Sequence, residues 1–124
     1  MDFYAKVEEL AERDPRYKAD AYEFVMQGLH FTQKRFKRQG HVRGKELAEG
    51  IRDLAIEQFG PMARTVFTHW GVGRTEDLGN IVFNMIDKKV FSKNEEDSLQ
   101  DFKNVYDFER VFSSALRDHV KEHK

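Results

Sequence analysis

The chain has 124 residues, of which 40% are hydrophobic and 35% charged, and its formal net charge is −1. This size and composition predict a single domain, residues 1–124, that buries a core without covalent cross-links. The chain has no Cys, which excludes disulfides and thiolate metal sites. No apolar stretch is long enough for a transmembrane helix, and the acidic start is unlike a signal peptide, so we expect a cytoplasmic protein.

The first half of the chain is predicted to be helical. Apolar residues recur at helical spacing over residues 2–13, 19–38 and 44–59. Asp2 is a candidate cap for the first of these helices, and Gly60 supplies a stop for the third.

The second predicted helix is rich in aromatic residues: Tyr22, Phe24, Phe31 and Phe36. These side chains could line a ligand pocket or a partner groove. Because large apolar residues at helical spacing are mostly buried, we expect them in the core.

The second half is predicted to continue with helices at about 61–70, 75–90 and 107–122, with Thr75 as a cap. Residues 91–106 are ambiguous, because they fit one or two helical turns or a hairpin that pairs Val90-Phe91 with Val105-Tyr106. We favour the hairpin. The expected fold is therefore mainly α, a compact bundle of about six helices, with a winged-helix-like part at residues 44–106.

The charge is unevenly distributed along the chain. Residues 34–45 hold six Lys or Arg and no acid, whereas the segments on either side are acidic. The candidate binding residues, including an interleaved histidine, are Lys34, Arg35, Lys37, Arg38, His41, Arg43 and Lys45.

Two interpretations of this basic segment are open. Cations at the C-terminal end of a helix complement its dipole, so the segment is expected as a solvated face. Alternatively it binds an anionic partner, with nucleic acid slightly favoured over an acidic protein surface.

No motif for catalysis or metal binding is recognisable. His119 and His123 have the i, i+4 spacing of metal ligands but lack an evident third ligand, and Gly71-Val72-Gly73-Arg74 does not match a phosphate loop. We therefore expect no catalytic residue, no metal site and no cofactor.

Three runs carry a resemblance to a known family: residues 21–36, residues 49–64, which include Gly60-Pro61-Met62, and residues 101–108. Together they resemble an uncharacterised bacterial family of small helical proteins, a domain of unknown function. The resemblance implies bacterial origin and a self-contained domain, and it carries over no active-site residue.

Two functions are the leading hypotheses, and an enzyme or metal protein with a site assembled from distant residues is the third. Abundant aromatic residues and acidic flanks favour a non-enzymatic helical protein-interaction module of the bacterial cytoplasm, which binds another protein or a second copy of itself. The alternative is a nucleic-acid- or phosphate-binding protein that uses the segment from Lys34 to Lys45.

Overall fold

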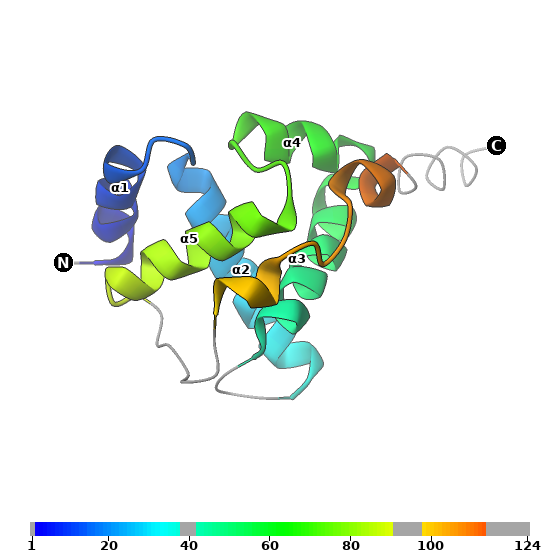
Figure 1. Ribbon diagram of the computed structural model, residues 1–124, viewed down its shortest axis with the longest axis horizontal. Helices are drawn as coiled ribbons and strands as arrows, with labels where there is room; N and C mark the ends of the chain where they lie inside the picture. The colour runs from blue at the N-terminus through cyan, green and yellow to red at the C-terminus, as the bar shows by residue number, and fades with distance from the viewer. Residues whose placement is uncertain (1, 38–41, 91–97, 114–124) are drawn as a thin grey trace.

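The computed structural model describes residues 2–37, 42–90 and 98–113 (Figure 1). Within these ranges five α-helices and two 3-10 helices have both ends described. In chain order they are α1 (Phe3–Arg13), α2 (Ala19–Arg35), α3 (Gly44–Phe59), η1 (Gly60–Met62), α4 (Ala63–His69), α5 (Thr75–Asp87) and η2 (Leu99–Phe102). Helix α2 contacts α1, α3 and α5, so it lies at the centre of the fold. The mainly α class is confirmed, whereas the count of about six helices is not supported.

Helix α1 begins at the predicted cap. The side chain of Asp2 accepts a hydrogen bond from the backbone N–H of Ala5, at 2.8 Å. This bond satisfies one of the N–H groups that the first turn of a helix leaves without a partner. Val7 and Leu10 are buried, and they pack α1 against the rest of the core.

Helices α2 and α3 approach closely through two glycines. A Cβ added at Gly28 would lie 2.5 Å from a side-chain carbon of Ile51, and one added at Gly50 would overlap the hydroxyl of Thr32. Gly28 of α2 meets Ile51 of α3, and Thr32, further along α2, meets Gly50, which precedes Ile51 on α3. The two helices therefore run antiparallel. The C-terminal end of α2 therefore lies beside the N-terminal end of α3 (Figure 1).

Helix α3 ends where the sequence predicts. Gly60 follows Phe59 with φ of +52° and begins the 3-10 helix η1, in which Pro61 is the second residue and which leads into α4. The aromatic rings of Phe24, Phe59 and Trp70 meet here, with centroids 5.2–5.8 Å apart. Such ring pairs bury large apolar areas and hold α4 against the α2–α3 pair.

Thr75 does not cap α5 as predicted. Arg74 occupies the cap position without a side-chain hydrogen bond, and Thr75 is the first helical residue. The hydroxyl of Thr75 is buried and accepts a hydrogen bond from the backbone N–H of Val105, at 3.1 Å. The threonine therefore attaches the segment after η2 to the start of α5, a long-range role that local spacing does not reveal.

The predicted hairpin and wing are not supported. No strand is present in residues 42–90 or 98–113, and residues 91–97 lie outside the described ranges. Leu99–Phe102 forms a 3-10 helix, whose start Ser98 caps by accepting from the N–H of Gln100. Phe102 is buried beside Gly44 and Gly79, where an added Cβ would lie about 2.9 Å from its atoms. The side chain of Phe102 fills the space that side chains at Gly44 and Gly79 would occupy. This packing, and not the pairing of strands, attaches the segment to the rest of the fold.

The last predicted helix is described only at its start. Residues 108–113 are helical, and residues 114–122 lie outside the described ranges. Phe108 and Phe112 are buried with ring centroids 5.2 and 5.4 Å from that of Phe67. Among the described residues, no helix combines the length and the apolar character that crossing a membrane requires.

Candidate functional site

The basic segment is divided between the end of α2 and the start of α3. Lys34 lies in the last turn of α2, Lys37 follows that helix, Arg43 occupies the cap position of α3, and Lys45 is in its first turn. These four residues are exposed, and within the described ranges none forms an ion pair. Arg38 and His41 lie outside the described residues. We call the four exposed cations the basic end.

Arg35 does not contribute to the basic end. Its guanidinium forms an ion pair with Asp53 of α3 at 2.7 Å and lies over the ring of Phe31, 4.9 Å from the centroid. Arg52 donates to the other oxygen of Asp53 at 2.8 Å. Burial opposes ionisation of Asp53, but hydrogen bonds from the two arginines hold its pKa below the ordinary value. Arg35 therefore joins α2 to α3.

The helix dipoles divide the basic end into two kinds of position. Lys34 lies at the C-terminal end of α2, where a cation is favourable. Arg43 and Lys45 lie at the N-terminal end of α3, where the dipole repels a positive charge. The side chain of Glu46 accepts from the backbone N–H of Arg43 at 2.9 Å and supplies the favourable negative charge there. The two cations at α3 are therefore not explained by helix stability.

An aromatic side chain accompanies these cations. Tyr22 and Phe24 are buried in the core as predicted, and Phe31 is partly buried. Phe36, the residue directly after α2, is 41% exposed, so its predicted burial is wrong. Because α2 ends there, Phe36 no longer follows the helical stripe that turns its neighbours inward.

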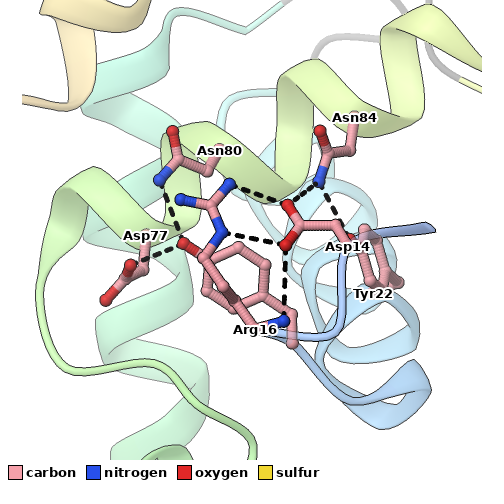
Figure 2. A network of polar contacts seen from close by, with 7 residues as sticks. Asp14, Arg16, Tyr22, Asp77, Asn80 and Asn84 are labelled. Atoms are coloured by element: carbon pink, nitrogen blue, oxygen red, sulfur yellow. Dashed lines mark hydrogen bonds and ion pairs between the residues drawn. The ribbon is translucent and has the colours of Figure 1, made fainter. Parts of the chain in front are cut away.

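A second polar cluster joins the α1–α2 turn to α5 (Figure 2). The hydroxyl of Tyr17 donates to Asp77 at 2.6 Å and accepts from the side-chain amide of Asn80 at 3.0 Å. The other oxygen of Asp77 accepts from the backbone N–H of Gly73 at 2.9 Å. Tyr17 is only 1% exposed, so these bonds satisfy a hydroxyl that the fold removes from water.

The other half of the cluster centres on Asp14. Its carboxylate accepts two side-chain hydrogen bonds from Arg16, at 2.8 and 2.7 Å, and one from Asn84 at 2.9 Å. Asn84 also donates to the hydroxyl of the buried Tyr22, at 3.0 Å. The hydrogen bond from Arg16 is the main reason that the pKa of Asp14 lies well below its usual value.

The cluster is suited to holding the turn in place. Burial, with the hydrogen bond to Asp77, raises the pKa of Tyr17 to about 12, so its hydroxyl stays protonated at neutral pH. A protonated tyrosine bound on both sides is no base or nucleophile. The sequence reasoning missed this cluster because its partners are separated by 60 residues or more. The local sequence indicates the cluster only through the spacing of Asp77, Asn80 and Asn84, which places these polar residues on one face of α5.

The described ranges contain no group of three or more His, Asp or Glu side chains that could hold a metal ion. His119 and His123 lie outside them. No protein-family model, curated protein or solved structure matches the chain. The function is therefore inferred from the geometry and charge of the chain itself.

Proposed function

We propose that this protein is a non-enzymatic helical interaction module of the bacterial cytoplasm that binds an acidic protein partner through the basic end. The observation that carries the proposal is the position of Arg43 and Lys45. They are exposed and lack an ion pair within the described residues, at the helix end where their charge is unfavourable. A local arrangement that opposes helix stability is typical of a functional surface.

An acidic protein fits this surface better than nucleic acid does. The chain outside residues 34–45 carries an excess of acidic over basic residues. A long phosphate backbone that extends beyond the basic end would therefore meet a net negative charge and be repelled. A short acidic segment of a protein needs only a few cations and avoids this repulsion. Nucleic acid remains the alternative.

The proposal is tested by affinity capture from bacterial lysate, with and without nuclease treatment. The wild-type protein is compared with a double variant, Lys34→Glu with Lys45→Glu, which reverses one charge on each helix. We expect partner proteins to be retained by the wild type and lost from the double variant. Retained material that disappears on nuclease treatment would favour the alternative, and an unchanged set of proteins would contradict both.

The matched control is Arg64→Glu. Arg64 is exposed in the first turn of α4, which lies at the other end of the molecule from the basic end (Figure 1). The substitution makes the same charge change per residue outside the proposed surface. We expect it to leave the captured proteins unchanged.

A further inference from the structure

Exposed apolar side chains lie near the four cations of the basic end. The described residues expose four large apolar side chains: Tyr4, Phe36, Met62 and Leu99. Phe36 directly follows α2, and Leu99 begins η2. Each of these two segments lies against the start of α3.

The glycine contacts establish this neighbourhood. Because α2 and α3 run antiparallel with Thr32 against Gly50, the end of α2, which Phe36 follows, lies on the same side of the molecule as the start of α3 (Figure 1). On η2, Asp101 and Phe102 pack against Gly44, the first residue of α3, at 2.8 and 2.9 Å from an added Cβ. The start of α3, with Arg43 and Lys45, therefore lies between two segments that each expose an apolar side chain.

We propose that the basic end recognises an acidic segment of a partner protein in which apolar side chains alternate with carboxylates. This inference rests on the proposed function and narrows its partner class. The cations from the two helices bind the carboxylates, and Phe36 and Leu99 contact the apolar side chains. Charge brings the segment to this surface, and burial of the apolar side chains makes the binding selective.

The aliphatic side chain of Leu99 favours a protein segment over single-stranded nucleic acid as the partner. Single-stranded nucleic acids bind through stacking of bases on aromatic rings in a continuous positive groove. Phe36 offers one ring, but Leu99 offers none. A peptide with apolar side chains contacts both residues equally well.

The test uses fluorescence anisotropy with three labelled probes. The first is a short peptide of alternating Glu with Leu or Phe, the second replaces each apolar residue by Ser, and the third is oligothymidine. We expect the apolar peptide to bind about tenfold more tightly than the serine peptide, as burial of one or two apolar side chains provides. Phe36→Ser and Leu99→Ser should each reduce that preference. Met62→Ser, which removes an exposed apolar side chain outside the surface, should leave it unchanged.

The outcomes separate the two proposals. Equal binding of both peptides, abolished by Lys34→Glu with Lys45→Glu, would refute the apolar contacts and leave acidic-partner binding intact. Absence of binding, or binding that ignores this charge reversal, would refute the proposed function as well. Tighter binding of oligothymidine than of the apolar peptide would replace the protein partner by nucleic acid.

Discussion

Lys45→Glu should make the protein more stable while it removes a cation from the basic end. Lys45 is the second residue of α3, exposed, and without an ion pair among the described residues. Reversing its charge replaces an unfavourable interaction with the helix dipole by a favourable one, worth together about 1 kcal/mol. Repulsion between the new carboxylate and Glu49, four residues on, costs about 0.2–0.5 kcal/mol. Lys and Glu have similar helix propensity, so the net gain is about 0.5–0.8 kcal/mol.

Urea denaturation followed by circular dichroism measures this change in the free energy of unfolding. The mirror-image control is Lys34→Glu, which places a negative charge in the last turn of α2 and should destabilise the protein by a similar amount. Both effects should shrink at high salt, because both groups are exposed. A loss of stability with Lys45→Glu, or a change of the same sign in both variants, would refute the dipole reasoning on which the basic end rests.

Three further predictions concern the contacts that hold the fold. Tyr17→Phe should lower the free energy of unfolding by about 1–3 kcal/mol in urea denaturation, because it leaves the carboxylate of Asp77 without its 2.6 Å partner; a neutral result would contradict the role given to the cluster. Gly50→Ala should cost about 1–3 kcal/mol and lower the melting temperature, because the new methyl group overlaps the hydroxyl of Thr32, and an unchanged melting temperature would show that the helices separate without cost. Asp14→Asn should destabilise the protein at pH 7 and progressively less as the pH falls below about 4, because a carboxyl with a lowered pKa stabilises the fold only while it is ionised; urea titrations at several pH values should therefore converge in acid.

The helices that could be read from the sequence are those with local determinants. Helix α3 spans the predicted residues 44–59, because its apolar period is regular and Gly60 follows it. Helix α2 stops at Arg35, earlier than predicted, and Lys37 follows with φ of +55°. A lysine in the left-handed region gives no sequence signal comparable to that of glycine, so this end was predicted too late.

The candidate site was found by sequence in part. A run of six cations is visible in any sequence, but its separation into paired and unpaired groups depends on Asp53, which is 18 residues from Arg35 along the chain. The exposure of Phe36 depends in the same way on where α2 ends. Binding at residues 34–45 stays a prediction, now limited among the described residues to Lys34, Lys37, Arg43 and Lys45.

The sequence by itself determined the helical class, most helix boundaries and the presence of one basic segment, because periodicity, glycine stops and charge are local properties. Only the tertiary structure decided how distant residues meet. It placed Phe102 in the notches at Gly44 and Gly79, where sequence reasoning expected a hairpin, and it joined Tyr17 to Asp77. It also placed the basic end across two antiparallel helices. All of these arrangements depend on packing between residues that are far apart along the chain, and such pairs leave no periodic pattern in the sequence.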